Sequence, residues 1–148
     1  MKTYALFACI ALAGLGQPAR VMAQHTVTVK IPKLKEPKGH LHVFLCNDSK
    51  AFYDKAVQTR VMPVNPQGET KIVFANVPKG AYAIRVFQDL NNSHALDRSM
   101  MDIPEEPVGF SNNPPVNMGP PDFESARFEV NTSVEHKILL HSFKYTLF

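Results

Sequence analysis

The chain has 148 residues, of which 45% are hydrophobic and 20% charged, so its length suits one domain with a core of its own. Its 16 basic and 13 acidic residues give a formal net charge of +3, and no cluster of Lys and Arg with interleaved aromatic residues occurs. This composition argues against a nucleic-acid partner.

Residues 1–23 have the pattern of an export signal. Lys2 supplies a positive charge, an apolar stretch runs from Tyr4 to Leu15, and small or aliphatic residues lead up to Ala23. The apolar stretch is too short to span a membrane. We expect cleavage after Ala23, and therefore a mature chain without a membrane span in the periplasm or the extracellular medium.

Cleavage would also change the charge and the cysteine content. It removes Lys2, Arg20 and Cys9, so 14 basic and 13 acidic residues remain and the net charge falls to +1. Cys46 is then the single cysteine, and no internal disulfide can form. The domain must be held together by its core, or by a bound ion or partner.

The rest of the chain, residues 24–148, reads as an all-β domain because its apolar residues alternate with a period of two. In the segment His40 to Cys46, for example, His40, His42, Phe44 and Cys46 share the face opposite Leu41, Val43 and Leu45. About seven strands suit an immunoglobulin-like sandwich. Strands are expected at residues 25–31, 40–46, 70–77, 81–88, 125–130 and 134–145, with a helical turn and a short strand within 51–64.

Two connections complete this prediction. Pro78-Lys79-Gly80 is expected to join strands 70–77 and 81–88 as a pair. Residues 89–124 form a long loop rich in Pro, Asn, Asp, Gly and Met. Loops of this length in compact domains are usually functional or disordered, so we place the candidate binding region there.

The first candidate site in this loop is a calcium site. Four oxygen-bearing side chains stand at positions one, three, five and nine of a calcium-loop register: Asp89, Asn91, Ser93 and Asp97. Position six is His94 instead of Gly and position twelve is Met100 instead of Glu, although Glu105 or Glu106 could fold back as a substitute ligand. The alternative is a turn whose Asx side chains bond their own backbone, and these departures favour that turn.

A second candidate is a transition-metal site. His40 and His42 stand two residues apart on a predicted strand, so both imidazoles project from one face, with Cys46 further along it. Imidazole suits Zn²⁺ or Cu²⁺, but two histidines are too few for a closed site. The alternative is a chance placement on a solvent-facing side of the strand.

The third candidate is a partner-binding surface of four successive residues: Phe110, Ser111, Asn112 and Asn113. Prolines around them restrict the chain and lower the entropy cost of binding. The alternative, which we favour for the aromatic rings, is that Phe110 and Phe123 plug the end of the sandwich. Gly109 to Asn113 lacks the second Gly of a nucleophile elbow, so no catalytic residue is assigned.

Three segments stand out as motifs: residues 77–84 read VPKGAYAI, residues 89–91 read DLN and residues 103–113 read IPEEPVGFSNN. Together they resemble domain-of-unknown-function family 2141. The resemblance implies an exported bacterial protein with a signal peptide and one β domain, and it carries no activity. The Pro-x-Gly-x-Tyr element is also similar to those of transthyretin-like sandwiches, which agrees with the expected architecture.

We therefore expect an exported, non-catalytic module that binds a protein or glycan of the cell envelope, or a cation, through residues 89–124. No cofactor is expected apart from Ca²⁺. The alternatives are a hydrolytic or enzyme-accessory domain with a scattered site, and a purely structural envelope protein.

Overall fold

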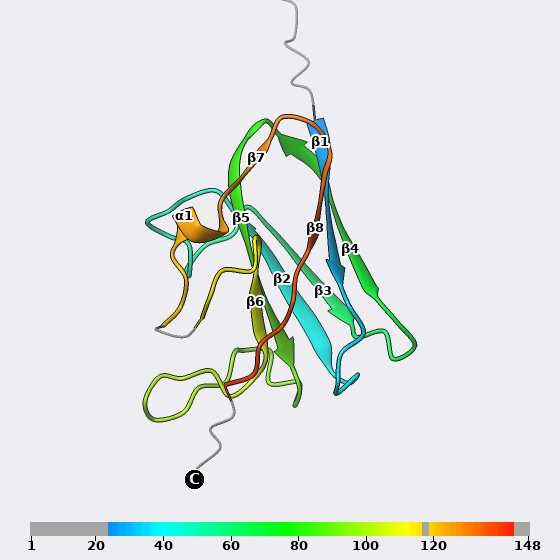
Figure 1. The fold of residues 1–148 in the computed structure, drawn as a ribbon, viewed down its shortest axis with the longest axis vertical. Coiled ribbons are helices and arrows are strands. Elements are labelled where there is room, and N and C mark those ends of the chain that lie inside the picture. Colours follow the sequence, from blue (N-terminus) through cyan, green and yellow to red (C-terminus); the bar gives the residue numbers. More distant parts are fainter. Residues whose placement is uncertain (1–23, 117–118, 144–148) are drawn as a thin grey trace, which may run out of the picture.

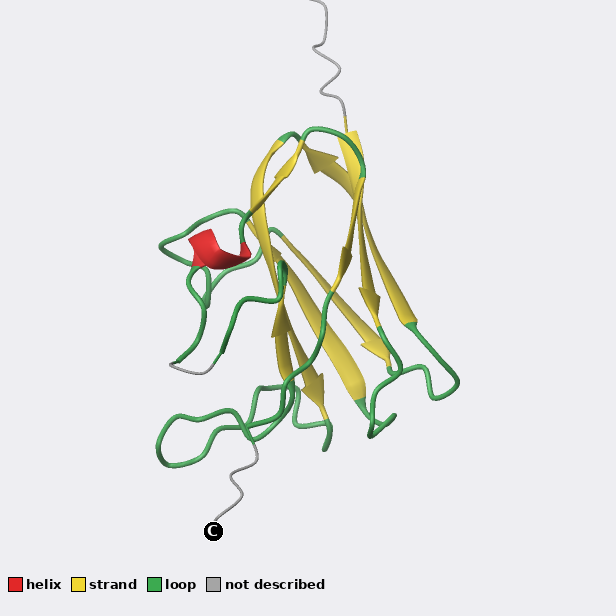
Figure 2. Ribbon diagram, viewed as in Figure 1, coloured by secondary structure: helices red, strands yellow, loops and turns green. Residues whose placement is uncertain are grey.

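The computed structural model describes residues 24–116 and 119–143 (Figure 1). They form two β-sheets and one short helix, which confirms the all-β sandwich (Figure 2). The expected export signal, residues 1–23, lies outside the described residues. No helix in the described part of the chain is both long and apolar enough to cross a membrane.

The smaller sheet has three strands in the order β4-β1-β8. Strand β1 (Gln24–Ile31) pairs antiparallel with β4 (Thr70–Pro78) and parallel with β8 (Val134–Lys137). The alternating residues Val27, Val29 and Ile31 are fully buried, as the period of two predicts.

The larger sheet has five strands and is built around β5 (Gly80–Asp89). One edge of β5 pairs with β2 (His40–Cys46), which in turn pairs with β3 (Gln58–Pro63). The other edge is shared by two three-residue strands, β7 (Phe128–Val130) near its start and β6 (Val108–Phe110) near its end.

The main core lies between the two sheets. From β2 it takes Leu41, Val43 and Leu45, the three residues predicted to share a face, and from β5 it takes Tyr82, Ile84 and Val86. The smaller sheet contributes its own alternating apolar residues. This shared interior is what makes the two sheets one domain.

The expected pairing of the strands on either side of Pro78-Lys79-Gly80 is wrong. Strand β4 pairs with β1 and β5 pairs with β2, so the chain crosses from one sheet to the other at this point. The apolar faces of β4 and β5 thereby meet across the core instead of lying side by side. The hydroxyl of Tyr82 donates to the carbonyl of Pro78 at 3.0 Å and holds this corner.

The last two predicted strands are shorter than expected. Residues Phe123–Ala126 form the helix α1, because Asp122 caps it by accepting a hydrogen bond from the Ser125 amide at 2.8 Å. Strand β8 ends at Lys137, and from there the chain crosses β6, where Val108 and His141 form an isolated bridge. The final five residues, 144–148, lie outside the described part of the chain.

The face of the larger sheet that points away from the smaller one, here called the outer face, is covered. A strand of a sandwich normally exposes this face, and the prediction that it meets solvent is wrong. Residues 90–107, the described residues between β6 and β7, and the turn after β2 fold over it (Figure 1). A second set of buried residues, here called the outer cluster, packs there: Cys46, Phe52, Ala83, Phe87, Val108, Phe110, Phe123 and Ala126.

Candidate functional site

The covering segment leaves a cavity of about 540 Å³ over the outer face. Its floor comes from β2 and β5, and its walls come from the turn after β2 and the segment between β5 and α1. The aromatic rings of Phe44, Tyr53, Phe87 and Phe110 line it. Cavities of this size and apolar character are the usual places for small ligands.

Arg85 provides a fixed positive charge in this cavity. Its Nε donates to the Phe52 carbonyl at 2.9 Å, and its guanidinium carbon lies 4.0 Å from the centre of the Phe44 ring. No salt bridge within the described residues involves Arg85, whereas the other cavity arginine, Arg98, pairs with Asp102 at 3.4 Å. A stacked guanidinium held in one orientation suits recognition of a carboxylate or similar anion.

Tyr53 closes one side of the cavity. Its hydroxyl donates to the Pro121 carbonyl at 2.5 Å, which ties the turn after β2 to the segment before α1. Burial raises the pKa of Tyr53 to about 12, although the nearby Arg85 and Arg98 oppose that shift. The phenol therefore stays protonated and keeps its role as a donor.

Of the four predicted calcium ligands, Asp89 ends β5 and the other three lie in the compact loop that follows it. The Asp89 carboxylate accepts hydrogen bonds from the amides of Ser93 and His94 at 3.1 and 3.0 Å. Asn91 Nδ2 donates to Asp97 Oδ2 at 2.6 Å, and Asn91 Oδ1 accepts from the Ser93 amide. These are the bonds of an Asx turn, and calcium binding stays a prediction.

Asp89 is fully buried at the end of β5. Burial by itself would raise the pKa of this carboxyl, but the amides of His94, Ser93 and Asn92 and the neighbouring His42 outweigh it and lower the pKa. Asp89 is therefore an anion inside the protein. His94 has φ 65, so the sixth position of the loop adopts the left-handed backbone that calcium loops usually assign to Gly.

Glu106, and not Glu105, closes this loop. Its Oε1 accepts from the Leu90 amide at 2.7 Å and its Oε2 accepts from the Asp97 amide at 3.2 Å. Glu106 is 3% exposed, whereas Glu105 is exposed to solvent. Glu106 thus bonds both ends of the loop through backbone amides, and the acidic side chain of Glu105 lies outside the loop.

The two predicted histidine ligands take different neighbours. His40 Nδ1 lies 2.8 Å from Asn92 Oδ1 at the rim of the sheet. His42 is buried, and together with Asp89 and His94 it forms a group of three side chains that could bind a metal ion. Sequence reasoning missed His94 as a ligand because it stands in the chain as the wrong residue in a calcium pattern.

The four residues proposed for partner binding bond within the chain. Phe110 is 6% exposed and Ser111 fully buried, with the Ser111 hydroxyl donating to Ala126 and accepting from the Ile84 amide. Asn112 Nδ2 donates to the Arg127 carbonyl and Asn113 Nδ2 to the Lys137 carbonyl. This motif joins β5, β6 and the final crossing segment. Phe110 and Phe123 pack in the outer cluster.

A family model described as "Uncharacterized protein conserved in bacteria (DUF2141)" matches residues 29–137. No curated protein and no solved structure matches the chain. The matched range runs from within β1 to the end of β8, and so includes most of both sheets, the cavity residues apart from Phe143, and the loop after β5. The chain belongs to the bacterial family DUF2141.

Proposed function

We propose that this chain is an exported, non-catalytic binding module. The cavity over the outer face takes a small amphipathic molecule, with an apolar body against the rings and an anionic group on Arg85. The leader-like pattern of residues 1–23 supports export. The burial of Ser111, whose hydroxyl is bonded to the backbone, supports a role other than catalysis.

Arg85 is the observation that carries the proposal. A half-buried guanidinium loses part of its hydration, and an anion that bonds to its terminal nitrogens restores that loss. The Phe52 carbonyl and the Phe44 ring already hold the side chain in place, so little conformational entropy is lost on binding. The surrounding rings would bury the apolar part of the same molecule.

Two dyes that share one apolar body test this proposal. We expect 1-anilinonaphthalene-8-sulfonate, which carries a sulfonate, to bind saturably with a rise in fluorescence. N-phenyl-1-naphthylamine, which has no charge, should bind more weakly. Arg85→Met should weaken sulfonate binding by about tenfold or more, the size of a charge-assisted hydrogen bond, and leave the neutral dye unchanged.

Arg60→Met is the matched control. Arg60 is also half-buried and lies over a ring, 5.3 Å from the centre of Phe74, but it does not line the cavity. This variant should bind both dyes like the wild type. The proposed anion site would be rejected if both arginine variants lost the same affinity for the sulfonate dye, or if Arg85→Met lost none. Near-ultraviolet circular dichroism checks that each variant remains folded.

A further inference from the structure

His42 has a buried nitrogen without a hydrogen-bond partner. The residue is 7% exposed, and its Nε2 is one of two buried side-chain nitrogens in the described residues that make no hydrogen bond. The ring stacks on Phe87 with centroids 4.5 Å apart and planes 11° apart, so its orientation is fixed. A buried polar atom without a partner lowers the stability of the folded state, so its presence needs a physical explanation.

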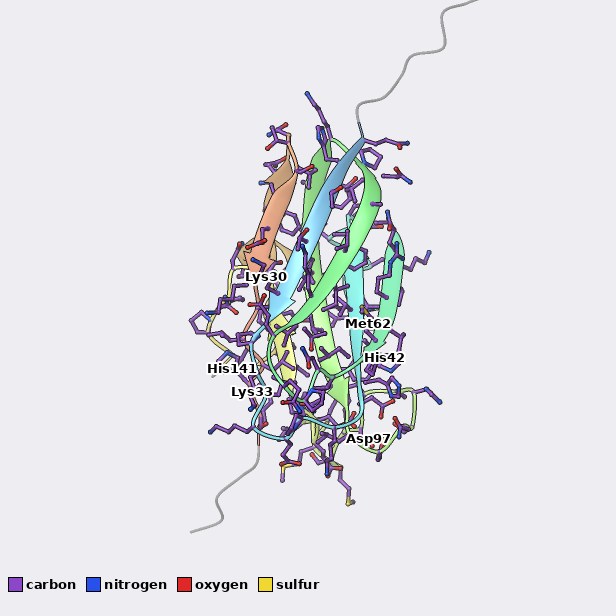
Figure 3. The ribbon with its side chains drawn as sticks, turned by 90° about the vertical axis from the view of Figure 1, so that its right-hand side faces the viewer. Lys30, Lys33, His42, Met62, Asp97 and His141 are labelled. Atoms are coloured by element: carbon purple, nitrogen blue, oxygen red, sulfur yellow. The ribbon has the colours of Figure 1, made fainter. Side chains whose placement is uncertain are left out.

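Two further side chains surround this nitrogen. Asp89 Oδ2 lies 3.4 Å from His42 Nε2, outside hydrogen-bond geometry. His94 supplies the third group, and one ligand atom from each of the three residues lies within 4.8 Å of the others. Figure 3 shows His42 at the same end of the molecule as Asp97, which belongs to the loop that carries His94.

The strand register produces this arrangement. His42 pairs with Phe87 and His40 pairs with Asp89 in the antiparallel ladder of β2 and β5. Asp89 is therefore the diagonal neighbour of His42 on the outer face, within reach of its side chain. The tight loop after Asp89 then turns His94 back toward both residues.

The distance between His42 and Asp89 fits two ligands of one metal ion. Ligands about 2.1 Å from a tetrahedral metal lie about 3.4 Å from each other. His94 needs a small shift to complete the same geometry, and its exposure to solvent leaves room for one. His42 and Asp89 are buried, whereas His94 is exposed to solvent. In such a site the two buried groups would be the rigid part, and an ion would enter on the side of His94.

We propose that His42, Asp89 and His94 bind one divalent transition-metal ion of the Zn²⁺ type, with the remaining coordination position open to solvent. Two imidazoles and one carboxylate are the ligands that such ions prefer. Ca²⁺ prefers oxygen ligands, and the Asn91 and Asp97 side chains of this loop bond each other. The site goes beyond the proposed function and does not depend on the cavity being filled.

Titration of metal-free protein tests the proposal. The protein is expressed from the full-length sequence without a histidine tag, treated with EDTA and returned to chelator-free buffer. Calorimetric titration with ZnCl₂ should give one ion per chain, and the thermal midpoint should rise as the ion stabilises the folded state. Imidazole resonances of His42 and His94 should shift together at one equivalent, while those of His141 stay in place.

Two histidine variants provide the comparison. His94→Gly should weaken Zn²⁺ binding by about tenfold or more, because a ligand is lost, while the folded state remains because Gly accepts a left-handed backbone. His141→Ala removes an exposed histidine at a separate labelled position in Figure 3 and should bind like the wild type.

Three outcomes would overturn the proposal. The first is no Zn²⁺ binding by the wild type, which would leave His42 and Asp89 as an ion pair only. The second is Zn²⁺ binding that His94→Gly leaves unchanged. The third is stabilisation by CaCl₂ and not by ZnCl₂, which would assign the loop to an oxygen-bound cation.

Discussion

The two faces of the five-stranded sheet differ in what they bury. The inner face carries apolar side chains from β2 and β5, such as Leu41 and Ile84, and packs against the smaller sheet. Its one buried polar side chain from these two strands, Gln88, is uncharged and donates to the carbonyls of Glu36 and Lys38. The outer face buries the outer cluster together with His42 and Asp89, and it holds the half-buried Arg85. One face therefore stabilises the fold, while the other combines packing with groups that can bind an anion or a metal.

This difference reflects how each face is covered. A second sheet covers the inner face with regular alternating apolar residues. An irregular segment covers the outer face, and such a segment can supply backbone carbonyls and amides to polar side chains. The Phe52 carbonyl holds Arg85 in this way, and the His94 amide bonds Asp89.

The largest expected effect is on the free energy of unfolding, when a large side chain on each face is replaced by alanine. Leu41→Ala should lower the free energy of unfolding by about 4 kcal/mol, since it opens a cavity in the closed core. Phe44→Ala should cost about 1–2 kcal/mol, because Phe44 is half-buried and borders an existing cavity. Urea unfolding measures both values, and equal losses would contradict the comparison.

A second, smaller effect concerns the crossing of the final segment over β6. A Cβ at Gly109 would lie 2.6 Å from the Leu139 carbonyl oxygen and 2.8 Å from Ile138 Cγ2. Gly109→Ala should therefore cost about 2 kcal/mol through overpacking. Gly68→Ala is the control, because its nearest neighbour, Asn65 Nδ2, would be 4.0 Å away. If the Gly109→Ala protein is as stable as the Gly68→Ala protein, the final segment does not pack closely against β6 at Gly109.

The smallest expected effect is a dependence on pH within the smaller sheet. Burial lowers the pKa of His136 from its usual 6.5, so the unfolded chain binds this proton more readily than the folded one. The free energy of unfolding should then fall as the pH drops below about 6.5, and His136→Gln should remove that part of the loss. Urea unfolding of both proteins at about pH 7.5 and about pH 5.5 makes the measurement. If the free energy of unfolding falls by the same amount in the wild type and in His136→Gln, His136 is not the cause.

Most strands could be predicted because alternation of apolar residues is a local property. The segments 40–46 and 25–31 follow this rule, and β2 begins and ends where the pattern does. The wrong pairing across Pro78-Lys79-Gly80 has a plain origin. A turn sequence such as this one predicts that the chain reverses direction. It does not predict whether the next strand joins the same sheet or the opposite one.

The sequence predicted only part of the candidate metal site. Asp89 belonged to the calcium-loop hypothesis and His42 to the histidine-pair hypothesis. His94 was an argument against the calcium loop, because it occupies the position of Gly. The register between β2 and β5 unites them, and a register is set by pairing between distant strands. Arg85 is a single charged residue between the apolar residues of its strand, and nothing else in the sequence marks it as a binding residue.

The sequence by itself determined the class of fold, the buried inner face of each long strand and the position of the unusual segment at 89–124, since these follow from local residue patterns. The tertiary structure alone decided that the described parts of this segment cover the outer face, that Arg85 lines a cavity, and that His42, Asp89 and His94 lie close together. Those features depend on contacts between residues far apart in the chain, and such contacts exist only when both sheets and their covering segment have packed together.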